Sequence, residues 1–92
     1  MTSTPINNRV PLIGSWLNSG STTVAELMAR SGFDFVTIDM EHSPVSIELL
    51  ADLLRALSSG STKCKAFVRT VGHDYQDIKR YMDSGADGVI VP

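Results

Sequence analysis

Short apolar runs alternate with longer amphipathic segments along most of the chain. Four runs are rich in β-branched and aromatic residues, which is typical of buried strands. The segments between them carry apolar residues at helical spacing, as Val24, Leu27 and Met28 do. The pattern predicts strands at 12–17, 35–39, 65–69 and 88–91, and helices that begin near residues 23, 44 and 74.

Polar residues at the edges of these segments indicate where the helices begin and end. Thr23 and Glu26 fit a capping box at the start of the first helix. Ser43–Pro44 supplies a cap and a first-turn proline for the second helix, and residues 58–61 read as a turn after it. Asp74 is the expected cap of the third helix.

The order βαβαβαβ predicts a parallel sheet with right-handed crossovers. A doubly wound sheet and a (β/α)8 barrel both fit this order. The chain has 92 residues, whereas a complete barrel needs roughly 250. It also stops directly after a buried strand. We therefore expect residues 12–92 to be the N-terminal part of a (β/α)8 TIM barrel with four parallel strands, preceded by a loose leader at 1–11.

Composition indicates which binding partners and which cellular compartment to expect. Eight basic and ten acidic residues give a net charge of −2 without a basic stripe, so we expect no nucleic-acid partner. No apolar run approaches the roughly 18 residues of a membrane span, so we expect no membrane partner. The single cysteine, Cys64, precedes an apolar run and is expected to be a buried structural thiol. Cysteine usage fits a reducing cytoplasm.

Side chains able to transfer protons or bind anions follow two of the predicted strands. Asp39, Glu41 and His42 come where the second strand should stop, and Arg69 ends the third. A histidine beside carboxylates could act as a general base with an orienting partner. A guanidinium could hold a carboxylate or stabilise an enolate oxygen. The alternatives are a solvated turn with an incidental histidine and a surface arginine paired with an acid.

Two further features of the sequence could contribute to a reaction. Asp83 lies between the third helix and the fourth strand, at the opposite end of the sheet, where local reasoning gives it only a turn role. Asp39 and Glu41 have oxygen donors suited to Mg²⁺ or Mn²⁺, but two carboxylates do not make a metal site. The sequence contains no glycine-rich phosphate loop of Walker or dinucleotide type.

Several motifs, taken together and in this order, resemble the HpcH/HpaI family of class II, metal-dependent 2-oxo acid aldolases. The resemblance runs from residue 12 onward, and it implies a (β/α)8 barrel, usually assembled as a hexamer. It also implies cleavage of 4-hydroxy-2-oxo acids to pyruvate and an aldehyde. The motifs are Gly14-Ser15-Trp16-Leu17, Ala25-Glu26-Leu27, Gly32-Phe33-Asp34-Phe35, Ile38-Asp39-Met40-Glu41-His42, Val68-Arg69 and the segment from Met82 to Pro92.

The resemblance also implies roles for individual residues. His42 matches the family's catalytic base, and Arg69 matches the arginine that stabilises the pyruvate enolate. Asp83 matches an aspartate that raises the basicity of the histidine, and Asp39 matches a second acid near it. Glu41 matches a group close to the metal. The metal-binding Glu and Asp and a substrate-contacting Gln are expected beyond the end of this chain, with Mg²⁺ or Mn²⁺ as cofactor.

Three hypotheses for the function follow. The first is a carbon–carbon lyase that performs retro-aldol cleavage as part of a longer enzyme, with the 92-residue chain inactive alone. The second is a truncated, non-catalytic fragment. The third is a different barrel lyase, such as a citrate-lyase β-like enzyme.

Overall fold

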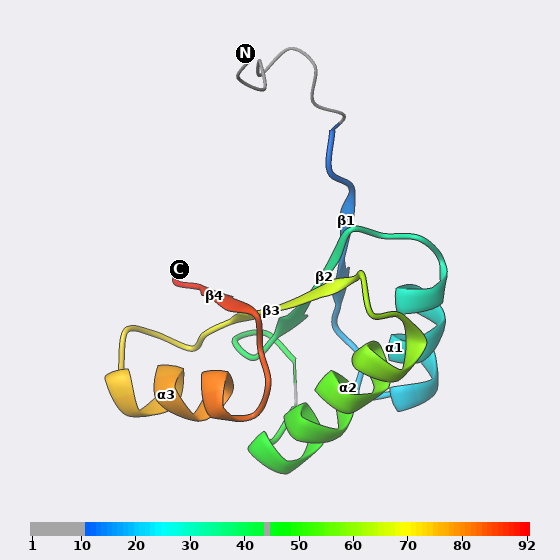
Figure 1. Ribbon diagram of the computed structural model, residues 1–92. Helices are drawn as coiled ribbons and strands as arrows, with labels where there is room; N and C mark the ends of the chain where they lie inside the picture. The colour runs from blue at the N-terminus through cyan, green and yellow to red at the C-terminus, as the bar shows by residue number, and fades with distance from the viewer. Residues whose placement is uncertain (1–10, 44) are drawn as a thin grey trace, which may run out of the picture.

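Four parallel strands form one sheet in the order in which they occur in the sequence. The computed structural model describes residues 11–43 and 45–92, so residues 1–10 of the predicted leader lie outside it. One helix joins each strand to the next strand in the sequence (Figure 1). The elements are β1 (Gly14–Leu17), α1 (Thr22–Arg30), β2 (Phe35–Asp39), α2 (Ile47–Gly60), β3 (Lys65–Arg69), α3 (Tyr75–Asp83) and β4 (Gly88–Ile90).

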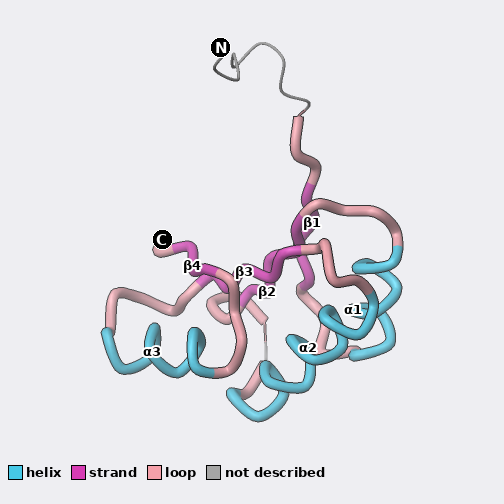
Figure 2. Tube along the Cα trace, in the orientation of Figure 1, coloured by secondary structure: helices cyan, strands magenta, loops and turns pink. Residues whose placement is uncertain are grey.

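The three helices lie on the same side of the sheet, as the tube view also shows (Figure 2). A doubly wound sheet has helices on both faces, whereas consecutive units of a barrel keep their helices outside. The sequential strand order and the one-sided helices therefore confirm the prediction of a partial barrel. Within the described residues, no helix is both long and apolar enough to span a membrane.

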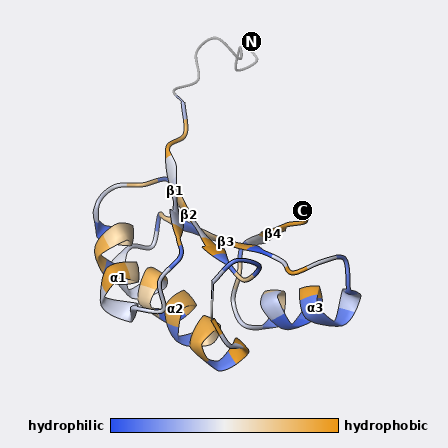
Figure 3. Ribbon diagram, turned by 180° about the vertical axis from the view of Figure 1, so that it is seen from behind, coloured by the Kyte–Doolittle hydropathy of each residue, from blue (hydrophilic) through white to orange (hydrophobic). Residues whose placement is uncertain are grey.

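The core lies between the sheet and the helices. Alternate residues of β2 and β3 point to this side, and Val36, Ile38 and Val68 are completely buried. They meet four buried leucines of α2, a helix that is more hydrophobic than α3 (Figure 3). This packing removes the most apolar surface from water and is the main stabilising contribution to the fold. The four leucines are Leu50, Leu53, Leu54 and Leu57.

The opposite, helix-free face of the sheet is the interior face of the barrel. Trp16 on β1 pairs in register with Thr37 on β2, which pairs with Phe67 on β3. The next row along this face contains Asp39 and Arg69, which are also partners in register. The strand register therefore brings an acid, a cation and an aromatic ring to one end of this face.

Two turns that lead from a helix into the following strand have the same construction. The sequences Ser-Gly-Phe-Asp at 31–34 and Ser-Gly-Ala-Asp at 84–87 precede β2 and β4. Gly32 and Gly85 adopt positive φ angles of 93° and 112°. Residues with a side chain rarely take this conformation, so glycine is needed where the chain leaves the helix.

The aspartates of these turns tie each new strand to its neighbour. The Asp34 carboxylate accepts the N–H of Ile13 at 2.8 Å, and the Asp34 N–H donates to the Ile13 carbonyl at 2.8 Å. Asp87 makes the same two contacts with Ala66, each at 2.8 Å. These reciprocal pairs set the register at the amino end of the sheet.

The helix boundaries differ from the predicted ones in three places. α1 is capped by Ser21, whose hydroxyl accepts the Val24 N–H, so the predicted capping box at Thr23 is wrong. α2 is capped by Ser46, whose hydroxyl accepts the Leu49 N–H. Ser43 therefore does not cap α2, and Pro44 lies outside the described residues. In both cases a serine other than the predicted capping residue satisfies the free backbone donor.

The end of α2 also differs, because the predicted turn at 58–60 is helical. A Cβ at Gly60 would lie 2.6 Å from the Glu26 carbonyl oxygen of α1. The glycine thus lets the two helices approach closely, and this tertiary contact continues the helix past the polar serines. The strands β1 and β4 are shorter than predicted, beginning at Gly14 and ending at Ile90.

Candidate active site at the carboxyl end of the sheet

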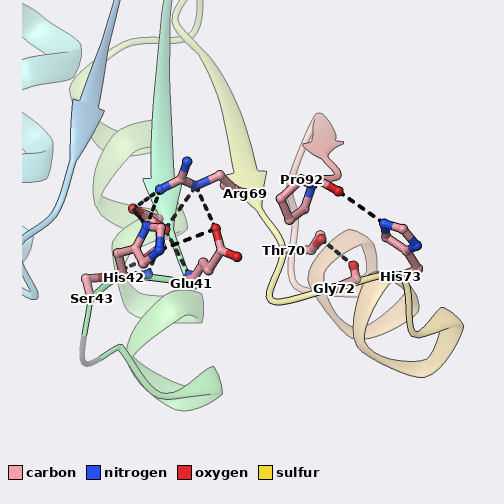
Figure 4. Close-up of polar contacts among 9 residues, drawn as sticks. Glu41, His42, Ser43, Arg69, Thr70, Gly72, His73 and Pro92 are labelled. Atoms are coloured by element: carbon pink, nitrogen blue, oxygen red, sulfur yellow. Dashed lines mark hydrogen bonds and ion pairs between the residues drawn. The ribbon is translucent and has the colours of Figure 1, made fainter.

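Four charged or titratable side chains meet where β2 and β3 end. Asp39 and Arg69 are the last residues of these strands and are register partners. Glu41 and His42 follow in the turn after β2, as Figure 4 shows for Glu41, His42 and Arg69. Asp39 is only 3% exposed. A carboxylate this deeply buried must be fully hydrogen-bonded.

Arg69 binds the Asp39 carboxylate through one edge of its guanidinium. Nε lies 3.3 Å from Oδ1 and Nη2 lies 2.7 Å from Oδ2. This two-point contact fixes the position of the Nε–Nη2 edge. The Arg69 hydrogen bond is the main reason that the pKa of Asp39 is lowered, and it outweighs the opposing effect of burial. Asp39 in turn raises the pKa of Arg69.

Asp39 also organises the turn that carries the histidine. Its Oδ1 accepts the backbone N–H groups of Glu41 at 2.9 Å and His42 at 3.1 Å. The Ser43 hydroxyl donates to the Asp39 carbonyl oxygen. These contacts are the Asx-type interactions expected of an aspartate at the start of a turn. Asp39 therefore positions His42 through the backbone and Arg69 through the side chain.

The His42 ring contacts Arg69 more closely than it contacts either acid. Its Nδ1 lies 2.7 Å from Arg69 Nη2 but 3.8 Å from Asp39 Oδ2. Its Nε2 lies 3.7 Å from Glu41 Oε1 (Figure 4). Because a guanidinium only donates, Nδ1 must be the acceptor, and the proton of the neutral ring then sits on Nε2. The expected pairing of Asp39 with the ring therefore runs through Arg69.

Trp16 adds an aromatic face to this cluster. The guanidinium carbon of Arg69 lies 4.8 Å from the centroid of the Trp16 ring. This distance is within the range of cation–π contacts. In the sequence, Trp16 lies near the end of the first predicted strand, at the same edge of the sheet as Asp39 and Arg69. Its signal is positional, because Trp16 lies on the same face of the sheet as Asp39 and Arg69 once the register is known.

The structure does not bring Asp83 to this cluster. Asp83 is the last residue of α3, before the turn that enters the amino end of β4. Its carboxylate pairs with Lys79 Nζ at 2.9 Å, and its side chain is 67% exposed. Within the described chain, Asp83 therefore has the helix-end position that local reasoning predicts. The role implied by the resemblance stays a prediction.

His73 also lies apart from the cluster. Its Nε2 contacts the carbonyl oxygen of Pro92 at 3.1 Å, and Figure 4 shows this pair away from the His42 group. The Thr70 hydroxyl donates to the Gly72 carbonyl at 2.6 Å in the same loop. These contacts hold the loop after β3 against the end of the chain, in line with a structural role for His73.

The cluster does not fit a divalent metal. Both Asp39 oxygens already accept hydrogen bonds, three to Oδ1 and one to Oδ2. In the part of the chain that the structure describes, no group of three His, Cys, Asp or Glu side chains could hold a metal ion.

A separate pocket lies at the amino end of the sheet. It has a volume of about 150 Å³ and lies between α2, the start of β3 and the turn before β4, with Cys64 and Asp87 in its lining. Cys64 is buried, as predicted. Burial is the largest cause that raises the pKa of its thiol, and Asp34 and Asp87 act in the same direction. A raised pKa leaves little nucleophilic thiolate, so Cys64 does not supply this pocket with a reactive thiolate.

Comparison with known protein families identifies the family of this chain. The model of the HpcH/HpaI aldolase/citrate lyase family matches residues 12–92. The chain belongs to this family. Its four parallel strands correspond to the N-terminal part of the (β/α)8 barrel of the HpcH/HpaI aldolases.

Individual HpcH/HpaI proteins support this assignment. A hydroxypyruvate/pyruvate aldolase of Rhizorhabdus wittichii is 40% identical over 86 residues, which are 94% of this chain and 34% of the relative. A 4-hydroxy-2-oxovalerate aldolase of Novosphingobium aromaticivorans is 38% identical over 80 residues, or 87% and 30% of the two chains. The crystal structure of an HpcH/HpaI aldolase/citrate lyase family protein from Burkholderia cenocepacia matches with a TM-score of 0.84 at 36% identity, covering 89% of this chain and 32% of that one. This chain spans about a third of the length of these relatives.

Proposed function

We propose that this chain is the N-terminal third of a lyase that cleaves a 4-hydroxy-2-oxo acid to pyruvate and an aldehyde. The observation that carries the proposal is the position of Arg69. Its guanidinium is fixed by Asp39 along one edge and lies 2.7 Å from the ring of His42. A fixed cation beside a potential base is the pair that enolate chemistry needs.

Arg69 has a free end that can receive the substrate. Nε and Nη2 are bound to Asp39, and no hydrogen bond joins Nη1 to any residue in 11–43 or 45–92. The outer edge of the guanidinium, formed by Nη1 and the second N–H of Nη2, is therefore the donor pair for an oxyanion of the oxo acid. The Arg69 side chain is 25% exposed, so part of it is accessible to a ligand.

Substrate binding at this edge frees the histidine for proton transfer. In the substrate-free arrangement, an N–H of Nη2 donates a hydrogen bond to the lone pair of His42 Nδ1. An oxyanion that takes the outer edge of the guanidinium competes with His42 for that N–H. Once released, Nδ1 can accept a proton while Nε2–H stays directed at Glu41, whose Oε1 is 3.7 Å away. The site thus becomes basic only when the substrate is present.

One turnover then consists of two proton transfers and the cleavage of one carbon–carbon bond. His42 removes the proton of the C4 hydroxyl, the C3–C4 bond breaks, and C4 leaves as the aldehyde carbonyl. The bond electrons form the C2–C3 double bond of the pyruvate enolate, whose oxyanion is stabilised by Arg69. His42 returns its proton to C3, which gives pyruvate. Asp39 stays ionised throughout and keeps Arg69 and the turn in place.

Three further features are part of the proposal. A divalent metal, Mg²⁺ or Mn²⁺, is held by residues outside this chain, and none of the steps above is assigned to it. The assembled enzyme is a cytoplasmic homo-oligomer, a hexamer as the resemblance implies. Asp83 raises the basicity of His42, although the two residues lie apart within this chain. An Asp83→Asn variant that keeps full activity would exclude this last role.

The direct test is pyruvate release by the full-length protein that carries this sequence. Purified wild-type and His42→Ala proteins are given 4-hydroxy-2-oxovalerate with excess Mn²⁺ or Mg²⁺, and pyruvate is measured by a coupled assay. We expect turnover by the wild type and a loss of at least about 100-fold in the variant, the typical range for a general base. Cleavage of citrate-like substrates without pyruvate release from any oxo acid would favour the alternative barrel lyase.

A second test uses the 92-residue chain alone. Within the described residues, the outer edges of β1 and β4 have no neighbouring strand to pair with, and Trp16, Ile90 and Val91 are exposed. We expect the isolated chain to associate in light scattering and to release no pyruvate. Metal-dependent turnover by a clean monomer would contradict the assignment of the metal ligands to later strands.

A further inference from the structure

Trp16 and Arg69 reach toward each other across the strand between them. They lie on β1 and β3, on either side of β2. Two strand spacings separate their backbones by about 10 Å, yet the guanidinium carbon is 4.8 Å from the ring centroid. The two side chains therefore meet above β2, whose last residue Asp39 lies in the Arg69 row. This cover explains why Asp39 is almost completely buried.

The guanidinium is held in two different ways. Asp39 binds its Nε–Nη2 edge, whereas the ring of Trp16 lies against the guanidinium carbon, 4.8 Å from the ring centroid. The contact with the carboxylate alone allows the guanidinium to rotate about its bound edge. The cation–π contact with Trp16 restricts this rotation, because it holds the guanidinium carbon over the ring.

We propose that Trp16 is a positioning residue for Arg69, and that its stacking aims the outer edge of the guanidinium at the substrate oxyanion. This inference rests on the proposed function and deepens it. Trp16 transfers no proton and need not touch the reacting atoms. The Trp16 side chain remains 47% exposed, so stacking does not bury the approach to the site.

The test is a substitution series at Trp16 in the full-length protein, read as kcat and KM for pyruvate release. Trp16→Phe keeps an aromatic face, while Trp16→Leu and Trp16→Met keep an apolar side chain without one. Losing a cation–π contact at a partly exposed site reduces binding by about 3- to 30-fold. We expect Leu and Met to raise KM by that factor, with kcat changed less, and Phe to stay within about threefold of the wild type.

The matched control is Phe67→Leu. Phe67 lies in the Trp16 row of the same face, and its ring packs on Phe35 with centroids 5.6 Å apart. The control removes an aromatic ring from the same face and leaves the Trp16–Arg69 contact in place. It should lower thermal stability with little change in KM. An equal rise in KM for Phe67→Leu would show that the effect at Trp16 is general loosening of the sheet, which overturns the inference.

A double-mutant cycle with Arg69→Ala gives the decisive readout. If Trp16 acts only through Arg69, Trp16→Leu has no further effect on kcat/KM once the guanidinium is gone. Effects that multiply in the double variant would overturn the inference, as would a Trp16→Leu enzyme with wild-type KM. Absence of turnover in the wild type would overturn the proposed function itself, so the two failures are distinguishable.

Discussion

The two ends of the sheet use the same residue type for different purposes. At the amino end, Asp34 and Asp87 each exchange two hydrogen bonds with the backbone of a neighbouring strand. At the carboxyl end, Asp39 also accepts backbone N–H groups, but it binds a guanidinium as well. The first two carboxylates are exposed, whereas Asp39 is buried.

The difference shows how a barrel separates stability from chemistry. A carboxylate that accepts only N–H groups of an adjacent strand fixes register and leaves no group free to react. A carboxylate that holds a cation with a free edge converts a structural contact into a binding site. This division agrees with the rule that barrel enzymes place catalytic groups at the carboxyl ends of their strands.

The largest effect is expected from removing one negative charge at each end. Asp39→Asn should lower kcat/KM for pyruvate release by at least about 100-fold, because the fixed cation that stabilises the enolate is lost. An asparagine also turns donor hydrogens toward the Arg69 donors. Asp87→Asn keeps an acceptor for the Ala66 N–H and should stay within about twofold of wild type. Comparable losses in both variants would remove the distinction between the two ends.

Exchanging the cations of β3 tests the geometry of the site rather than its charge. Arg69 ends this strand and Lys65 begins it. Arg69→Lys should lower kcat/KM by roughly 10- to 100-fold, since an ammonium cannot bind Asp39 along one edge and present another. Lys65→Arg should change it by less than about twofold. A fully active Arg69→Lys enzyme would mean that only a point charge is needed.

Lowering the pH should reduce the contribution of Asp39 to the free energy of unfolding. The Arg69 hydrogen bond holds the native pKa of Asp39 below its ordinary value of 3.8. The unfolded chain therefore takes up this proton first, so stability is lost as the pH falls from about 5 through the lowered native pKa, and not above that range. Urea unfolding of wild type and Asp39→Asn between pH 6 and pH 2.5 measures the difference. A gap between the two proteins that stays constant with pH would contradict the assignment.

The smallest effect is expected at a turn of the amino end. Gly85→Ala places a side chain at a φ of 112° with no atom nearby to clash. The cost is backbone strain alone, about 1–2 kcal/mol of unfolding free energy. Thermal melts should show this loss, while kcat/KM per folded enzyme stays at the wild-type value. A matching loss of activity would show that this end of the sheet takes part in catalysis.

The fold and the location of the site were largely predictable from the sequence. Alternating apolar runs identified all four strands, and the rule for parallel sheets placed His42 and Arg69 at one end. Helix starts were less predictable, because several serines and threonines stand near each boundary. Ser21 and Ser46 act as caps through backbone geometry that spacing alone does not reveal.

Contacts within the site depended on information that the sequence does not carry. The sequence predicted an acid near His42, and Asp39 Oδ2 lies 3.8 Å from its Nδ1. It did not indicate that the register brings Arg69 Nη2 to 2.7 Å from both side chains. The role of Trp16 could not be inferred without knowing that β1 lies next to β2 with Trp16 on the interior face. Cross-strand neighbours are tertiary information, and local patterns do not encode them.

The most direct test of the central claim is exchange of the pyruvate methyl protons in D₂O. In the proposed mechanism, forming the enolate requires the His42 base and the Arg69 cation and does not depend on the aldehyde. Full-length protein is incubated with pyruvate and divalent metal, and the methyl signal is followed by proton NMR. We expect exchange by wild type and Asp87→Asn, and exchange at least about 100-fold slower with His42→Ala and Asp39→Asn. Exchange by His42→Ala at the wild-type rate would contradict it, because the base would then lie outside this cluster.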